Sequence, residues 1–140
     1  KIEIIVHNYV SRHDLGEIFH APCDVILSNE DVVQPDILFI TKDRLNIITE
    51  KNIASPPDLV IEILSPYTEK LDRTIKRDLY ARYGVSEYWL ADPATKSIEV
   101  LSLSGKEFSS IGIYGIKDAF ESKVIKGLSV NIEEVFQGIG

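Results

Sequence analysis

A single carboxylate interrupts an otherwise apolar run, and this feature constrains the fold more than any other. The run covers residues 59–64 and reads Leu-Val-Ile-Glu-Ile-Leu, with Glu62 at its fourth position. Because both faces of such a strand would be apolar, we expect a central strand in a sheet that is covered on both sides. An ionised glutamate there is costly unless it pairs with a cation or binds a metal.

A second apolar segment, residues 33–40, contains a similar lone acid, Asp36, directly after Pro35. Two such acids on two strands favour a divalent metal site, because Mg²⁺ commonly takes one or two protein carboxylates and completes its shell with water and phosphate oxygens. A bound ion of this kind supports hydrolytic chemistry. Two simpler interpretations stay open: Glu62 could form a buried ion pair with Lys76, and Asp36 could be an ordinary strand-end carboxylate.

The composition limits the class of protein. The 140 residues are 44% hydrophobic, which suits one domain spanning 1–140 with a sizeable core. No apolar run has the length of a membrane-spanning helix, and Cys23, the one cysteine, is expected to be a small buried residue in a reduced, cytoplasmic protein. The net charge of −7 argues against a general nucleic-acid-coating protein but is compatible with a nuclease. Because the chain lacks an initial methionine and begins within a helical pattern, we expect a missing N-terminal segment.

Hydrophobic periodicity and turn residues predict a mixture of helices and strands. We expect a helix that closes near 13–16, strands at 17–27, 32–40, 58–64 and 87–92, a hairpin of 97–103 with 107–113, and a helix at 131–137. The connection 41–52 is expected to contain a short strand at 45–48. A helix over 68–83 should end at Gly84 and carry an apolar stripe of Leu71, Ile75, Leu79 and Tyr83. This order predicts an α/β sandwich with a mixed sheet.

Three segments occur in a characteristic order: Val33–Ile37 with Pro35-Asp36, Pro57–Pro66 with Glu62, and Asp72–Pro93 with Asp72, Lys76, Tyr80 and Gly84 at four-residue intervals. Together they resemble the PD-(D/E)XK nuclease superfamily, and most closely its Uma-type branch of putative restriction endonucleases. The resemblance covers roughly residues 16–127. It implies a restriction-endonuclease-like α/β sandwich with a central mixed sheet flanked by helices.

The resemblance implies an endonuclease that uses Mg²⁺ (or Mn²⁺) to hydrolyse phosphodiester bonds in DNA. Asp36 and Glu62 would hold the ion, with the main-chain carbonyl of Ile63 as a further ligand. The superfamily usually places a lysine two residues after the strand acid, a position that is Leu64 here. The Uma-type branch takes this lysine from the following helix instead, which matches Lys76. A homodimer is one way in which the protein could supply further cations for DNA binding.

Several residues are secondary candidates for the site. Asp58 shares a strand face with Glu62, although a role at the start of the strand is favoured for it. Asp72 lies four residues before Lys76, which is also the spacing of an ordinary helix ion pair. Tyr80 shares that helix face. The acid that these nucleases often carry in the first helix has a stand-in in Glu3.

Residues 69–82 contain five basic and three acidic residues, unlike the acidic remainder of the chain. If nucleic acid binds, we expect Lys70, Arg73 and Arg77 to contact it; a solvated helix face is the alternative. Three aromatic residues could stack on bases, but core packing is favoured for all of them: Tyr80, Tyr88 and Trp89. The histidines show no metal-ligand spacing: His7, His13 and His20.

Two other functions compete with the nuclease. The fold could serve as a binding or dimerisation module with a weakened site, which the acidic charge favours, because DNA binding depends on cations that neutralise phosphates. A metal-dependent hydrolase of a small phosphorylated substrate is the third hypothesis.

Overall fold

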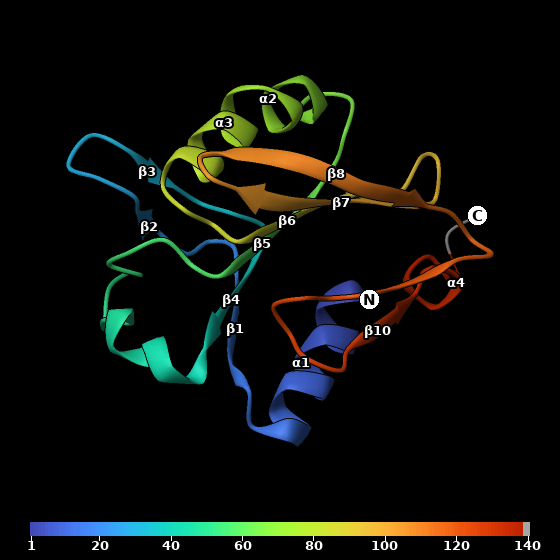
Figure 1. Cartoon of the computed structure of the whole chain (residues 1–140), viewed down its shortest axis with the longest axis horizontal. Coiled ribbons are helices and arrows are strands. Elements are labelled where there is room, and N and C mark those ends of the chain that lie inside the picture. Colours follow the sequence, from blue (N-terminus) through green and yellow to red (C-terminus); the bar gives the residue numbers. More distant parts are fainter. Residues whose placement is uncertain (139–140) are drawn as a thin grey trace.

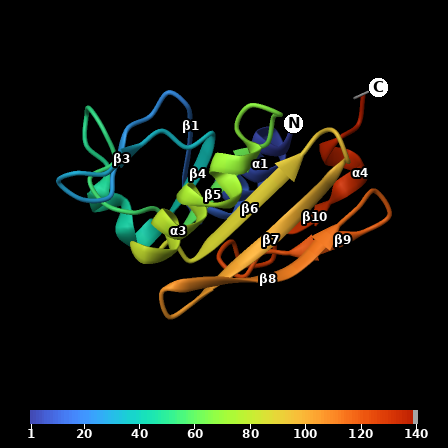
Figure 2. The ribbon, with the colours of Figure 1, turned by 90° about the horizontal axis from the view of Figure 1, so that it is seen from above.

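The centre of the protein is a six-stranded mixed sheet, seen in a computed structural model that describes residues 1–138 (Figure 1). Its strands, in spatial order, are β1 (Gly16–His20), β4 (Ile37–Thr41), β5 (Leu59–Ile63), β6 (Glu87–Asp92), β7 (Ser97–Ser104) and β8 (Glu107–Tyr114). Strands β5 and β6 are parallel, and all other neighbours are antiparallel. Figure 2 shows β6, β7 and β8 side by side. The predicted mixed sheet is confirmed.

Helices cover both faces of this sheet. Helix α1 (Ile2–His13) and the short α4 (Ile132–Val135) lie on one side, and α2 (Glu69–Arg73) and α3 (Ile75–Arg82) lie on the other (Figure 1). Alternate residues of β5 therefore belong to different cores: Leu59 and Ile61 pack with α1, whereas Val60 packs with α3. A strand that is buried on both faces explains the continuous apolar run around Glu62.

The two long strands predicted before residue 41 are each divided. The segment 17–27 forms β1 and then β2 (Val25–Ile26), and the segment 32–40 forms β3 (Val32–Val33) and then β4. Strands β2 and β3 pair with each other as a separate small sheet, and Val25 of β2 also forms an isolated bridge with Ile53. Pro35 has no amide hydrogen to give to a ladder, which accounts for the interruption between β3 and β4.

The connection after β4 also differs from expectation. Residues Lys42–Ile47 form a 3₁₀ helix, so the short strand predicted at 45–48 is wrong. A second small sheet follows β8 and pairs β9 (Ala119–Glu121) with β10 (Ser129–Asn131). The final helix is only Ile132–Val135, with the side chain of Asn131 accepting from the Glu133 amide at its N-terminus. Within residues 1–138, no helix is both long and apolar enough to cross a membrane.

The helix predicted over 68–83 is two helices with a break at Thr74. Half of the predicted apolar stripe is wrong, because Leu71 and Ile75 are 43% and 66% exposed. Leu79 and Tyr83 pack against the core as predicted. The face toward the sheet also carries Asp72 and Tyr80, both buried. These side chains take part in a polar network with the strand acid, described below, and Tyr80 also packs in the hydrophobic core.

The remaining predictions of local structure are mostly confirmed. Gly84 follows α3 with a positive φ of 88°, as a residue after a helix end often does. The hairpin of β7 and β8 turns at Gly105. Cys23, expected to be buried, is half-buried. The three aromatic candidates are fully buried, which confirms core packing rather than base stacking: Tyr80, Tyr88 and Trp89.

Candidate active site

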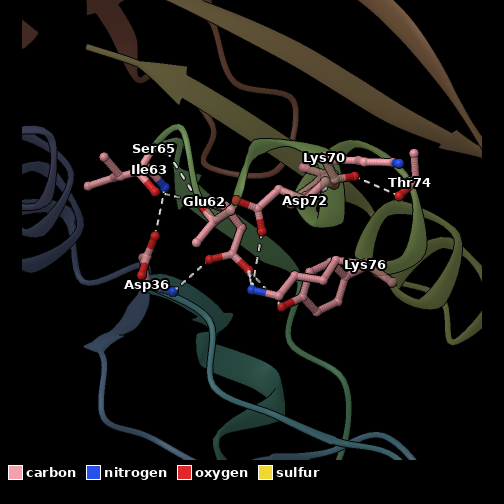
Figure 3. A network of polar contacts seen from close by, with 11 residues as sticks. Asp36, Glu62, Ile63, Ser65, Lys70, Asp72, Thr74 and Lys76 are labelled. Carbon is pink, nitrogen blue, oxygen red and sulfur yellow. Dashed lines mark hydrogen bonds and ion pairs between the residues drawn. The ribbon is translucent and has the colours of Figure 1, made fainter. Parts of the chain in front are cut away.

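Glu62 lies near the end of β5 with only 1% of its surface exposed. Both of its carboxylate oxygens accept hydrogen bonds (Figure 3). Oε1 accepts from the Asp36 amide at 2.9 Å. Oε2 accepts from Lys76 Nζ at 3.1 Å and from the Tyr80 hydroxyl at 3.0 Å. Three segments that are distant in sequence therefore meet at one buried carboxylate.

Asp36 immediately precedes β4, and the pairing of β4 with β5 brings it to Glu62. Ile37 lies opposite Ile61 in this antiparallel ladder, so the residues one step further along the two strands are neighbours. Oδ2 of Asp36 accepts from the Ile63 amide at 2.7 Å. Figure 3 shows the Asp36 side chain directed toward Ile63, next to Glu62.

Lys76 projects from α3 toward the sheet and is 24% exposed. Its Nζ lies 3.1 Å from Glu62 Oε2 and 3.2 Å from Asp72 Oδ1, so it does not pair with Asp72 alone (Figure 3). Asp72 is itself buried, and its Oδ1 has no well-aligned hydrogen bond within residues 1–138. The break at Thr74 lies between the two residues, so Asp72 belongs to α2 and Lys76 to α3.

The electrostatics of the network follow from its burial. Burial raises the pKa of Glu62 to about 7, against the opposing effects of the hydrogen bond from Asp36 and the attraction of Lys76. Burial acts to lower the pKa of Lys76, but attraction and hydrogen bonding to Glu62 and Asp72 raise it above the ordinary value. Burial and the nearby Glu62 also raise the pKa of Tyr80, so its hydroxyl remains a donor.

The donor atoms in this network suit a hard divalent cation. Asp36 and Glu62 supply carboxylate oxygens, and the main-chain carbonyl of Ile63 directly follows Glu62 along the chain. Asp36 Oδ1 accepts no hydrogen bond from the described part of the chain. Mg²⁺ and Mn²⁺ prefer oxygen ligands of this kind. Across residues 1–138, no three His, Cys, Asp or Glu side chains are grouped closely enough to hold a metal ion by themselves.

A cavity of about 360 Å³ opens beside Asp36 and Ile63. Glu3 and His20 also line it, and His20 Nε2 lies 3.8 Å from Glu3 Oε2. Glu3 thus lines the same cavity as Asp36, on the first helix, where an acid was expected. Sequence spacing assigned no role to His20. Its position depends on how β1 pairs with β4, and no local motif could have indicated it.

Asp58 does not join this network. Its Oδ2 accepts from the Thr41 amide at 2.8 Å, and its Oδ1 lies 3.0 Å from Arg44. Both contacts lie at the start of β5, whereas Glu62 lies near its end. The geometry agrees with the expected role at the start of the strand.

The three basic residues predicted to bind nucleic acid differ in the contacts that their side chains make within the protein. Arg73 forms ion pairs with Glu69 and Glu99 at 3.0 and 2.9 Å. Arg77 donates to the Phe108 carbonyl at 3.3 Å. Lys70 is exposed, and Figure 3 shows its side chain beside Thr74 rather than toward Glu62. Of the three, only Arg73 forms ion pairs with the described residues; Lys70 is exposed and Arg77 is half-buried.

Comparison with known proteins agrees with the fold and shows the family of the chain. The model of the Uma2 family, described as a putative restriction endonuclease, matches residues 1–133. The chain belongs to the Uma2 family. No curated protein matches it. Solved structures with this fold include a putative nuclease of the DUF820 group from Anabaena variabilis, with a TM-score of 0.76 and 18% identity over 96% of this chain and 75% of that chain. At this identity the likeness shows the fold.

Proposed function

We propose that this Uma2 protein is a Mg²⁺-dependent endonuclease, also served by Mn²⁺, that hydrolyses phosphodiester bonds in DNA. One observation carries the proposal: Asp36, Glu62 and Lys76 converge at the end of β5, with contacts of 2.9 and 3.1 Å to the Glu62 carboxylate. Membership in a family of putative restriction endonucleases supports it.

Asp36 and Glu62 would hold the ion, and the Ile63 carbonyl would complete the protein ligands. The ion would polarise the phosphate and lower the pKa of a bound water. The hydrogen bonds that Asp36 and Glu62 accept from the main chain at 2.7 and 2.9 Å orient both carboxylates before any ion arrives. Such orientation reduces the reorganisation that the reaction requires.

Lys76 would act on the phosphate or on the attacking water. Its ammonium group is held at the Glu62 carboxylate and stays charged, so it can orient the water or stabilise the negative charge that develops on the phosphorane. Asp72 and Tyr80 would be positioning residues. Asp72 holds Lys76 from the helix side, and Tyr80 fixes the second oxygen of Glu62.

The DNA strand would approach from the side of the cavity that Asp36 and Ile63 line. Lys70 would contact a phosphate, with Arg73 and Arg77 contributing after rearrangement of their present contacts. Because few unpaired cations border the site, each monomer would gain little affinity from phosphate neutralisation. A homodimer would double the number of cations available to one duplex.

A binding or dimerisation module without catalysis remains the second candidate. The observation that favours it is the Lys76–Glu62 ion pair, in which the central acid already has a protein cation 3.1 Å away. Cleavage of DNA distinguishes the two functions. The nuclease proposal expects the wild type to nick or linearise plasmid DNA with Mg²⁺ or Mn²⁺, and Lys76→Met and Glu62→Gln to be inactive. Wild-type protein that binds either ion but leaves DNA intact would favour the module.

A further inference from the structure

A second, larger cavity adjoins the candidate active site. Its volume is about 590 Å³, and His20 lines both it and the cavity beside Asp36. The chain also passes directly from one to the other, because Gln34 lines the larger cavity and Asp36 the smaller one. Two residues of extended chain span at most about 7 Å, so the two cavities are immediate neighbours.

We propose that the larger cavity binds a nucleobase of the substrate strand, adjacent to the phosphodiester held at Asp36. This inference rests on the proposed nuclease function and adds to it a contact with an unstacked base. A base in this position belongs to a strand that is locally unpaired, because a base within a duplex stack cannot enter a cavity.

Two side-chain amides in the cavity offer complementary hydrogen-bonding groups. Gln34 Nε2 donates to Asp24 Oδ1 at 2.7 Å, which leaves the Gln34 carbonyl oxygen as an acceptor. The Thr49 hydroxyl lies 2.9 Å from both the main-chain oxygen and Oδ1 of Asn52, which leaves the Asn52 amide nitrogen as a donor. Neither group has another partner among residues 1–138. One acceptor and one donor match the edge of a base such as thymine, which presents a ring N–H beside a carbonyl.

The walls and charges of the cavity favour a base over a phosphate. Five apolar residues contribute to the lining, as suits a flat uncharged ring: Ile18, Phe19, Pro22, Ile48 and Ile53. The charged residues of the lining are Asp24, Glu50 and Lys51. With two acids and one base, the cavity repels a phosphate group but not a neutral nucleobase.

The loop that forms one wall is held by main-chain hydrogen bonds. The Thr49 amide donates to the Asn52 carbonyl at 2.9 Å, and the Ile53 amide donates to the Asp24 carbonyl at 2.8 Å. The Ile26 amide in turn donates to the Ile53 carbonyl at 2.8 Å. A loop that is already ordered loses little entropy when a ligand binds, so the cavity is a preformed site.

The test is an NMR titration of ¹⁵N-labelled protein in EDTA, which keeps the probe strand intact. The probes are a single-stranded pentadeoxynucleotide with five thymines and the same strand with an abasic central position. We expect the thymine strand to shift the side-chain amide signals of Gln34 and Asn52. The abasic strand, and the thymine strand with Asn52→Ala, should bind about tenfold more weakly. Asn46→Ala, which removes an exposed amide outside both cavities, should bind as the wild type does.

The outcomes separate this inference from the function on which it rests. Shifts confined to Asp36 and Ile63, with equal affinity for both strands, would overturn the base site and leave the nuclease proposal standing. The absence of any shift would overturn the base site and would leave the nuclease proposal to the plasmid cleavage assay, because EDTA removes the ion that would hold the phosphate. The comparison of the thymine and abasic oligonucleotides uses unaltered protein. It therefore tests the base site even if Asn52→Ala is poorly folded.

Discussion

Asp36 and Glu62 are linked by reciprocal contacts across adjacent strands. The Asp36 amide donates to the Glu62 carboxylate at 2.9 Å, and the amide that follows Glu62 donates to the Asp36 carboxylate at 2.7 Å. Each acid is therefore oriented by the main chain of the other strand. Two carboxylates that face one another in this way repel unless a proton or a cation lies between or beside them. Lys76 is such a cation, and a divalent metal would be a second one.

The raised pKa of Glu62 predicts a dependence of stability on pH in the metal-free protein. Between its ordinary value of 4.5 and the folded value of about 7, the unfolded state is ionised at Glu62 while the folded state keeps the proton. The folded state then binds more protons, so the contribution of Glu62 to the free energy of unfolding falls as pH rises through this window, by up to about 3 kcal/mol.

This prediction is checked by urea unfolding at pH 5 and pH 7.5 in EDTA, for the wild type and Glu62→Gln. Other carboxylates titrate in both proteins, so the difference between the two proteins isolates Glu62. The variant should gain stability relative to the wild type as pH rises. A difference that does not change with pH would show that Glu62 has an ordinary pKa in the folded protein.

Lys76→Met removes the cation from two buried acids and should lower the free energy of unfolding by about 3 kcal/mol at pH 7.5, because breaking one side of a buried ion pair leaves uncompensated charge. The same change made in Glu62→Gln should cost at least about 1 kcal/mol less, since one of the two acids is then neutral. Chemical denaturation of the four proteins gives this coupling. Additive effects would mean that Lys76 and Glu62 do not interact in solution.

Tyr80→Phe and Tyr88→Phe form a matched pair. Each removes one buried hydroxyl, bonded to Glu62 at 3.0 Å in the first case and to the Asp72 carbonyl at 2.9 Å in the second. Both should lower the free energy of unfolding by about 1–2 kcal/mol. Only Tyr80→Phe should change Mn²⁺ affinity, because only Tyr80 orients a proposed ligand. Equal metal affinities for the two variants would argue against that role.

Asp58→Asn tests whether Asp58 has a structural role. The change weakens the contacts with Thr41 and Arg44, so we expect a loss of about 1–2 kcal/mol in the free energy of unfolding. Metal affinity, measured by calorimetry, should equal that of the wild type. A large loss of metal affinity in a variant that remains folded would make Asp58 a ligand and would require a different site.

The parts of the fold that could be predicted are those with strong local patterns. The apolar run around Glu62 indicated a central strand, and the turn residue Gly84 indicated a helix end; both are confirmed. The helix break at Thr74 had no such signal. It exposes Leu71 and Ile75, and a continuous periodic pattern predicts that they are buried.

In the candidate site, too, some features could be predicted from local sequence patterns and others could not. Asp36 and Glu62 could be selected from sequence because a lone acid in an apolar strand is costly, and Lys76 was selected by family resemblance. Their convergence depends on strand register and on the direction of α3, which no local pattern encodes. His20 and the cavity residues Gln34 and Asn52 depend entirely on which strands and loops pack together, so only the folded structure brings them to the site.

The central claim is that Asp36 and Glu62 form a divalent metal site. Isothermal titration calorimetry with Mn²⁺ at pH 8, on the wild type and Glu62→Gln, tests it most directly, because Glu62 is ionised at that pH and Mn²⁺ binds oxygen and nitrogen ligands more tightly than Mg²⁺ does. The account predicts one site per chain in the wild type and none in Glu62→Gln, with both proteins folded. Binding that is unchanged in Glu62→Gln, or absent from the wild type, would contradict it.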